Sequence, residues 1–412
     1  MVYDFNYYLF LLVIIISCIS FLWVRRENKE LKIYVIPFAV FITIYAGVGV
    51  AWSNTDITYL MYYCVWLVAF SFSLKWIVKK KNYAINRFSC ETSFFEKKGK
   101  WFIVSYIFLL LMQLAIEGKL NLLINPPQPD LRSTFDGTEI GGSGLIYLAK
   151  LVIYPFYLAS LIRYKDRLFF LLILLFFPFY VQYVESAYIA RSGVVAYLLI
   201  YLAIIYIYRP ALRKRLVVST LIAIPFFLVA LSWYTYARLG MDFSLNLTDA
   251  VSELLYQETS YTRHFNLLMA KEWDSSLMYD YFEWLFTLPL PGFLKGSSND
   301  FFFNAIFSER LYGVYRGEMG FSVYLPSVVN ESIFIFGPLL YVIHAIILGI
   351  FVGIIYRMFK YKEEYILFLY CSIYISSVLA RAGTFSIYSI YLKGLLVYFI
   401  VRAFFIKPIK HG

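Results

Sequence analysis

The stretch FGPLLYVIHAIILGIFVGIIY (336–356) holds 21 consecutive residues without a Lys, Arg, Asp or Glu. A helix of about 20 apolar residues is long enough to cross the roughly 30 Å hydrocarbon core of a bilayer. Comparable runs recur along the chain and predict eleven membrane spans, at about 7–24, 33–52, 59–77, 101–116, 145–162, 168–184, 194–208, 216–236, 336–356, 365–380 and 386–403. The runs are continuous rather than alternating, which excludes a β-barrel. The sequence therefore predicts an all-α polytopic integral membrane protein, with residues 1–412 forming a single membrane domain.

The positions of the positive charges predict how the chain is oriented in the membrane. One set of connectors, which begins with RRENKELK (25–32), carries 25 of the 37 Lys and Arg residues, counting Lys75 at the end of a span. Short loops rich in Lys and Arg stay in the cytoplasm. This rule places the C-terminus in the cytoplasm and the N-terminus on the periplasmic side. Much of the net charge of +11 then reflects topology and contact with anionic membrane lipids.

The composition excludes several classes of protein. Hydrophobic residues make up 61% of the chain and charged residues only 15%, which is far from the balance of a soluble domain. The basic connectors are explained by topology, so we expect no nucleic-acid binding. The three histidines and four cysteines are too dispersed in the sequence for a metal site, and we expect neither a metal nor another cofactor.

Two connectors on the predicted periplasmic side are long enough to hold a site. The smaller one spans 117–144 and contains Pro–Pro and Gly–Gly pairs, which indicate irregular backbone. The larger one spans 238–335 and carries twelve carboxylates against six cations, although the whole chain is basic. Within it, residues 249–271 are predicted to form an amphipathic helix, with His264 on the polar face. We expect this large periplasmic loop to pack on the membrane face.

Arginines on the predicted periplasmic side suggest a site for a phosphate-containing substrate. They come from four separate connectors: Arg132, Arg191, Arg263, Arg310, Arg316 and Arg381. A guanidinium group binds phosphate through two parallel hydrogen bonds and stays charged at all relevant pH values. Several of them in one cavity would bind a diphosphate and stabilise its charge as it leaves. The alternative for each residue is an anchor in the lipid headgroups or a local ion pair.

Three residues are candidates for proton transfer: His264, Glu318 and Glu331. The usual pKa of histidine suits a general base near neutral pH. Glu331 lies five residues before the predicted re-entry into the membrane at Phe336, where a carboxylate is costly unless it is paired. Aromatic residues make up 21% of the chain, and Tyr261, Tyr315 and Tyr324 are candidates for contact with sugar rings. Aromatic side chains are equally common at membrane interfaces, so the sequence leaves both uses open.

Short motifs in this architecture resemble a known family. Arg191-Ser192-Gly193 at a span start, the single large late loop, GFSVYLPSVVNESIFIFG (320–337) and Arg381-Ala382-Gly383 are similar to bacterial O-antigen polymerases of the Wzy type, the oligosaccharide repeat unit polymerases. The resemblance covers the whole chain in architecture and only these short motifs in sequence.

The resemblance implies a glycosyltransferase similar to the GT-C membrane class, in the inner membrane of a bacterium, with its active site facing the periplasm. Its substrates would be oligosaccharide repeat units linked to undecaprenyl diphosphate, which it would polymerise in lipopolysaccharide biosynthesis. Lipid diphosphate would be the leaving group, and neither a nucleotide sugar nor a metal would be needed. A chain-length regulator protein is a further partner that the resemblance implies.

Other functions fit parts of the same pattern. An O-antigen ligase, which transfers the glycan to lipid A core, would share the spans, the large loop and the arginines. A flippase or transporter of lipid-linked oligosaccharides would instead place its charges inside the helices and have short loops. A partner protein of polysaccharide synthesis without catalytic activity is a third alternative.

Overall fold

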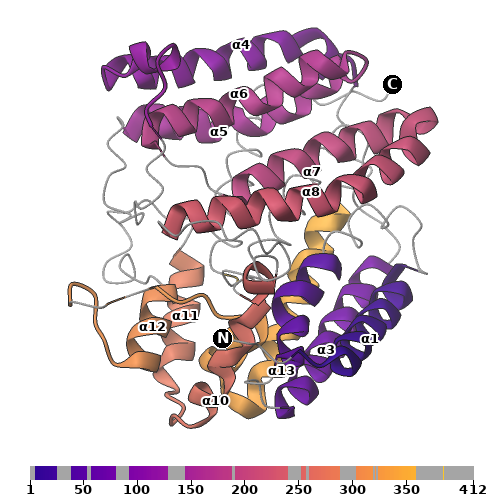
Figure 1. Ribbon diagram of the computed structural model, residues 1–412, viewed down its shortest axis with the longest axis vertical. Helices are drawn as coiled ribbons and strands as arrows, with labels where there is room; N and C mark the ends of the chain where they lie inside the picture. The colour runs from indigo at the N-terminus through magenta and orange to yellow at the C-terminus, as the bar shows by residue number, and fades with distance from the viewer. Residues whose placement is uncertain are drawn as a thin grey trace, which may run out of the picture. The chain divides into compact units, whose positions relative to one another are not determined.

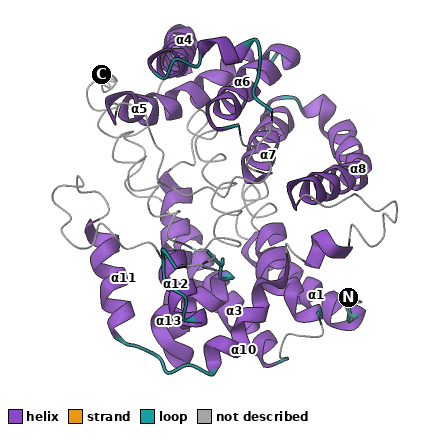
Figure 2. Cartoon of the chain, turned by 60° about the vertical axis from the view of Figure 1, so that its left-hand side comes forward, coloured by secondary structure: helices purple, strands orange, loops and turns teal. Residues whose placement is uncertain are grey.

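The computed structural model describes residues 5–25, 39–52, 57–79, 92–128, 144–187, 191–239, 252–256, 259–287, 303–318, 321, 323–358 and 384. Nearly all of these residues are helical, and among them no strand is found beyond a single bridge between Phe5 and Trp52 (Figure 2). In the part of the chain that the structure describes, six helices are long and apolar enough to cross a membrane: Tyr7–Val24, Thr58–Lys79, Lys97–Ile116, Leu168–Ser186, Pro210–Tyr234 and Val328–Ile355. The prediction of an all-α membrane protein is thus confirmed.

The count of eleven spans and their orientation stay predictions. Two further apolar helices, Ala39–Ala51 and Val194–Tyr208, coincide with predicted spans but are shorter. Helix α5 (Gly144–Ser160) also coincides with one, at 17 residues. The predicted spans 365–380 and 386–403 lie outside the described residues.

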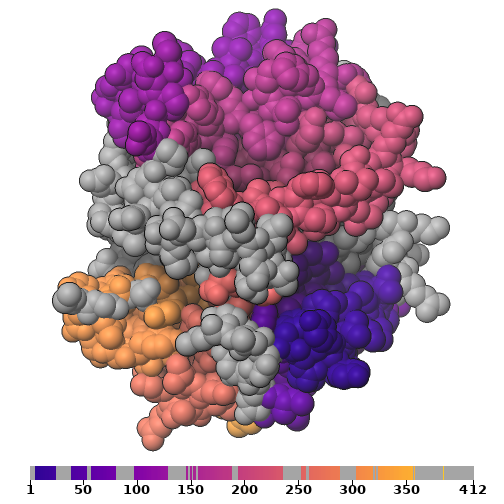
Figure 3. Space-filling view, viewed as in Figure 1, coloured from indigo at the N-terminus to yellow at the C-terminus, as the bar shows by residue number. Residues whose placement is uncertain are grey.

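The chain divides into two compact units. The first contains residues 1–86, 255–359 and 371–396, and the second contains residues 87–254, 360–370 and 397–412. In the first unit, α3 (Thr58–Lys79) packs against both α1 (Tyr7–Arg25) and α13 (Val328–Met358) (Figure 1). Helix α1, whose atoms are indigo in Figure 3, has Leu11, Ile15 and Ile19 exposed at helical spacing, and these side chains form an apolar stripe. Such a stripe suits contact with lipid.

Two glycines allow α13 to approach α3 closely. A Cβ atom on Gly349 would lie 2.0 Å from Oγ of Ser73 and 2.6 Å from the carbonyl oxygen of Phe70. One turn later, a Cβ on Gly353 would lie 2.8 Å from Ile77. Small residues four positions apart are a common means of packing membrane helices, because lipid provides little hydrophobic force to hold them together.

The short helices after α1 connect the membrane helices of this unit to its part of the large loop. The π-helical turn η2 (Thr43–Gly47) and the 3₁₀ turn η3 (Val48–Ala51) bring Gly49 against Thr262, where a Cβ atom would lie 2.2 Å from the threonine Oγ1. Beside it, Nε1 of Trp52 donates a 2.7 Å hydrogen bond to Oγ1 of Thr259. This part of the loop is thereby packed on helices that precede it by some two hundred residues.

Helix α13 is interrupted near its middle. Gly337 has φ 78° and ψ 169°, outside the helical region, and Pro338 follows it. Proline lacks an N–H group and cannot continue the hydrogen-bond ladder of the preceding turn. The helix begins at Val328, eight residues before the predicted re-entry at Phe336. Glu331 therefore lies in its first turn and not in a loop.

The second unit is built from α4 (Thr92–Ile116), α5, α6 (Leu168–Ser186), α7 (Arg191–Tyr208) and α8 (Arg213–Leu239). Helix α4 packs along α5, and the rings of Tyr106 and Tyr157 stack there at 4.5 Å. Most of the α8 span is exposed, with Leu221, Ile222 and Phe226 on its surface.

Polar groups at the ends of these helices are paired. Lys150 of α5 donates to Oε1 of Gln113, and Nε2 of Gln113 donates to Glu185 and to Glu117. Lys119 completes the group with an ion pair of 3.4 Å to Glu117. Ionisable groups at the apolar part of a membrane protein are tolerated when they are paired in this way.

The close approach of α13 to α3 makes a testable prediction. Gly349→Ala places a methyl group against the backbone of α3, and overpacking of this kind costs about 1–3 kcal/mol. We expect a lower midpoint of thermal unfolding in detergent. Gly99→Ala is the matched control, because a Cβ atom there meets Ser160 only at 3.4 Å, an ordinary contact. Equal midpoints for the two variants would contradict the close packing.

Candidate functional site

The predicted site residues are distributed over both units. His264, Glu318 and Glu331, with Arg263, Arg310 and Arg316, belong to the first unit, as do the three tyrosines Tyr261, Tyr315 and Tyr324. Arg191 is the first residue of α7 and belongs to the second unit. Arg132 and Arg381 lie outside the described residues.

His264 is buried and not on an exposed polar face. The predicted helix over 249–271 is in fact a set of short pieces, which include the 3₁₀ turn η8 (Ser260–Arg263) and α10 (His264–Met269). A 3₁₀ turn advances each residue by a larger angle than an α-helix, so the faces shift after Arg263. The prediction of one continuous amphipathic helix was wrong for this reason.

The His264 side chain is 1% exposed and lies among aromatic rings. Its ring contacts Phe307 and Tyr324 edge to face, at 5.9 and 5.6 Å between ring centres. Its Nδ1 atom lies 2.6 Å from the hydroxyl of Tyr312, which is itself 38% exposed. Burial and the nearby Arg263 guanidinium lower the pKa of His264 to about 4. The imidazole is therefore neutral at pH 7, and its Nδ1 atom shares a short hydrogen bond with the Tyr312 hydroxyl.

Glu331 is fully buried, and both its oxygens are occupied. The backbone N–H of Thr384 lies 2.9 and 2.7 Å from the two carboxylate oxygens, and its hydroxyl donates at 2.6 Å to Oε1. A carboxylate held in this way does not reach a substrate directly. Its visible role is to attach Thr384 to the first turn of α13.

From Thr384 a chain of hydrogen bonds continues through the buried interior. The hydroxyl of Tyr281, on α11 (Ser276–Thr287), lies 2.8 Å from Oγ1 of Thr384 and 3.3 Å from Nε2 of His344. On the other side of the ring, Nδ1 of His344 lies 2.7 Å from Oγ of Ser332. Nε1 of Trp66 ends the chain by donating to Ser332 at 3.0 Å.

Hydrogen counting gives the roles at the two ends of this chain. Thr384 gives its only hydroxyl proton to Glu331, so it accepts from Tyr281. Ser332 gives its only hydroxyl proton to the carbonyl oxygen of Val328 at 2.7 Å, so it accepts from Nδ1 of His344 and from Nε1 of Trp66. The contact between the Tyr281 hydroxyl and Nε2 of His344 joins the two ends.

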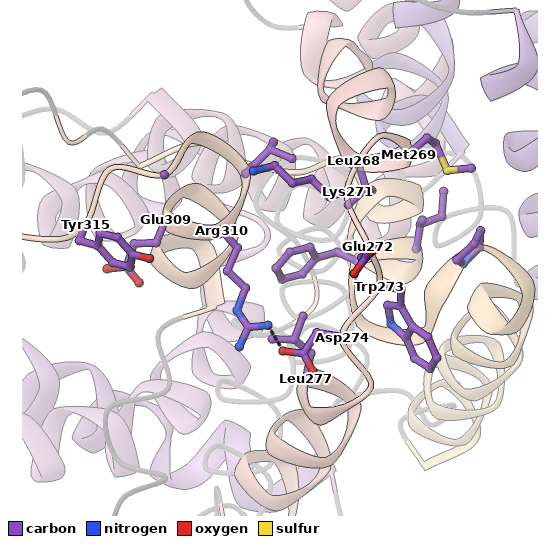
Figure 4. Close-up of a pocket in the computed structure, with 15 residues that line it drawn as sticks. Leu268, Met269, Lys271, Glu272, Trp273, Asp274, Leu277, Glu309, Arg310 and Tyr315 are labelled. Carbon is purple, nitrogen blue, oxygen red and sulfur yellow. Dashed lines mark hydrogen bonds and ion pairs between the residues drawn. The ribbon is translucent and has the colours of Figure 1, made fainter.

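A cavity of about 470 Å³ opens beside the break in α13. Its walls come from the connector that joins α10 to α11, from the end of α12 (Phe303–Tyr312) and from the residues around the break (Figure 4). The charged lining residues are Lys271, Glu272, Asp274, Glu309 and Arg310, and the aromatic ones are Trp273, Tyr315 and Phe334.

Ion pairs order the charged side of this cavity. Arg310 forms an ion pair with Asp274, which the close-up shows across the α11 end of the cavity (Figure 4). Hydrogen bonds from Ser276 and then Arg310 lower the pKa of Asp274 to about 2. Nε of Arg316 lies 2.9 Å from Glu309, and Glu318 accepts a 2.8 Å hydrogen bond from the backbone of Tyr315.

The structure thus separates residues that the sequence grouped together. Of the three candidate tyrosines, only Tyr315 lines the cavity, while Tyr324 covers His264 and the carbonyl of Tyr261 accepts from Asn330. Sequence reasoning noted Trp273 only among the many aromatic residues of the long loop, and it did not identify Thr384 and Tyr281 as partners of Glu331. The Gly337-Pro338 pair is the sequence feature that indicates a partner such as Trp273. A helix break leaves carbonyl groups that need a donor from outside the helix, and the indole N–H is such a donor.

Comparison of the chain with protein-family models, with curated proteins and with solved structures finds no significant match.

The buried state of His264 predicts how stability depends on pH. A pKa that is lower in the folded chain means that the unfolded chain binds more protons, so stability falls as the pH falls from about 6.5 to 4. A shift of this size corresponds to about 3 kcal/mol. We expect His264→Gln to lose this part of the acid sensitivity, measured as unfolding midpoints between pH 7.5 and 4. Parallel curves for the variant and the original chain would exclude a contribution of His264 to the acid sensitivity.

The hydrogen bond from Ser332 to Val328 predicts the tautomer of His344. Nitrogen NMR of the protein labelled at histidine has only three residues to resolve. We expect His344 to carry a proton on Nδ1, because Ser332 gives its own proton to the Val328 carbonyl and must accept from the ring. Ser332→Ala should disturb that tautomer while His264 keeps its signal. A proton on Nε2 alone would mean that Ser332 donates to His344 and not to Val328.

Proposed function

We propose that this chain is a glycosyltransferase of the bacterial inner membrane that polymerises oligosaccharide repeat units linked to undecaprenyl diphosphate into O-antigen. One observation carries the proposal. A cavity with carboxylates, cations and aromatic side chains opens where a membrane-length helix meets the long polar segment that precedes it. Ile333, Phe334 and Pro338 of that helix form part of its wall.

The substrate of such an enzyme makes opposing demands on its site. Its polyprenyl tail stays in hydrocarbon, its diphosphate needs cations, and its sugars need hydrogen bonds and flat apolar surfaces. A site that meets these demands must lie at the boundary between lipid and water. The position of the cavity beside the start of α13 supports this assignment, with the active site on the periplasmic side as the charge distribution predicts.

In the proposed reaction, a hydroxyl group of the acceptor attacks the anomeric carbon of the donor glycan. A new bond forms between that carbon and the hydroxyl oxygen, and the bond to the diphosphate oxygen breaks. The lipid diphosphate leaves with the bonding electron pair, and the hydroxyl proton goes to a base. A diphosphate is a good leaving group, so no general acid is required.

We assign the base to Tyr312 and His264 acting together. As the acceptor hydroxyl gives its proton to the Tyr312 oxygen, Tyr312 gives its own proton to Nδ1 of His264. The 2.6 Å contact and the half-exposed Tyr312 side chain support this assignment. Tyr312 also lies in sequence between Leu311 and Gly313, which both line the cavity. Glu331 is less suited, because its oxygens are buried and occupied by Thr384.

We assign the diphosphate to arginines of the first unit. The Arg263 side chain is exposed, and its charge reaches His264. Arg316 is about half-exposed in an ion pair with Glu309, which lines the cavity. Guanidinium groups in such positions can bind phosphate oxygens in pairs of parallel hydrogen bonds and stabilise the leaving group.

Deleting the gene and examining the surface polysaccharide on a gel tests the proposal. Loss of a polymerase leaves the core with one repeat unit attached, while loss of a ligase or a flippase leaves bare core. Complementation with Arg263→Gln or Arg316→Gln should give shorter chains at normal protein levels. Arg215→Gln, which changes an exposed arginine at the start of α8, is the matched control and should restore normal length. Bare core in the deletion strain would exclude the proposed function.

A further inference from the structure

We propose that the cavity beside the α13 break binds an uncharged pyranose ring, with Trp273 as the surface on which the ring stacks and Gly337 as the residue that holds Trp273 in place. The inference rests on the proposed function for the source of the sugar, which would be part of the lipid-linked glycan. It assigns this part of the substrate to the cavity and assigns the diphosphate elsewhere.

The position of Trp273 is fixed by the break in α13. A Cβ atom on Gly337 would lie 2.8 Å from Cδ2 and 3.1 Å from Cε2 of the indole, so the ring lies directly against the glycine backbone. The backbone at φ 78° is one that glycine alone adopts readily. Any other residue at position 337 would push the ring away and strain the chain.

A hydrogen bond holds the indole in the same position. The interruption at Gly337 and Pro338 leaves carbonyl groups of the preceding turn without their partners within the helix. Nε1 of Trp273 donates to one of them, the carbonyl of Ile335, at 3.3 Å. One side of the ring is thus occupied by the backbone. The side chain remains 40% exposed, and Trp273 is one of the residues that line the cavity. Trp273 is a preformed flat surface with a fixed orientation.

The charges around this surface select against a phosphate. The lining carries two cations, Lys271 and Arg310, and three carboxylates, Glu272, Asp274 and Glu309, which gives a net charge of −1. Arg310 is already paired with Asp274. An anion that entered would meet an excess of negative charge and would have to compete for the arginine.

The same charges select against an apolar chain. A hydrocarbon tail in the cavity would remove charged side chains from water and offer them no hydrogen bonds, which is costly. A pyranose ring avoids both problems. Its C–H face packs on the indole, while its hydroxyl groups donate to the carboxylates and accept from Lys271. The uncharged sugar is therefore the ligand whose chemistry matches both the ring and its surroundings.

Fluorine NMR of the full-length protein labelled with 5-fluorotryptophan tests the inference. The chain has eight tryptophans, and Trp273→Phe identifies the signal of residue 273 by its absence. The protein is placed in lipid nanodiscs, because the sugar headgroups of maltoside detergents would compete for the site. The probes are the methyl glycosides of glucose, galactose, mannose and N-acetylglucosamine, with inorganic pyrophosphate as the anionic probe.

We expect at least one methyl glycoside to shift the Trp273 signal saturably at millimolar concentration, and pyrophosphate to leave it unchanged. Glu272→Gln should weaken this response at least several-fold. Gly337→Ala should move the Trp273 signal before any sugar is added. Trp233→Phe, which changes an exposed tryptophan of α8, is the matched control and should leave the sugar response unchanged. A response to pyrophosphate, or to none of the four glycosides, would overturn the inference.

This experiment is independent of the test of the proposed function, since it requires neither a lipid-linked donor nor turnover. If a sugar shifts the Trp273 signal but deletion of the gene leaves bare core, the sugar site stands and the polymerase function is excluded. If the deletion gives the phenotype of a polymerase but no sugar shifts the signal, the polymerase function stands and this assignment of the cavity is excluded.

Discussion

The interruption of α13 at Gly337 and Pro338 is the constraint on which the rest of the first unit depends. A membrane-length helix satisfies its backbone internally, and a break leaves groups that need outside partners. Trp273 supplies one of these partners from the long segment, through its bond to Ile335. The break therefore fixes one wall of the cavity. It also means that a carbonyl group of the helix has its hydrogen bond only when the connector between α10 and α11 packs against it.

The two sides of this break carry different chemistry. Before it, the first turns of α13 hold Glu331 and Ser332 in a buried chain of hydrogen bonds. After it, Gly349 and Gly353 let the helix lie directly on α3. Close packing on one half makes the helix a rigid support, so that the polar half can hold Thr384 and Tyr281 in fixed positions. A site on a rigid element keeps its geometry better than one on a loop.

The sequence predicted the class of fold because that class depends only on local composition. A run such as that of α3 is apolar enough to identify a span without knowledge of its partners. The face of a short helix depends instead on where the chain turns. His264 was expected on a polar surface, but the 3₁₀ turn before it and the rings of Phe307 and Tyr324 make it a buried residue. No local pattern encodes those distant rings.

The candidate site was predicted less well, because the sequence does not show which group pairs with a buried carboxylate. A carboxylate near the membrane must be paired or catalytic, and this holds for Glu331. The structure shows a pair, but the partner is the backbone and hydroxyl of Thr384, not an arginine. Thr384 brings no positive charge, so the buried carboxyl group depends on these hydrogen bonds. Loss of Thr384 would leave a buried polar group without its partners, which is costly. For this reason Glu331 is assigned to the positioning of this segment, and the proposed proton transfer is assigned to the partly exposed Tyr312 with His264 behind it.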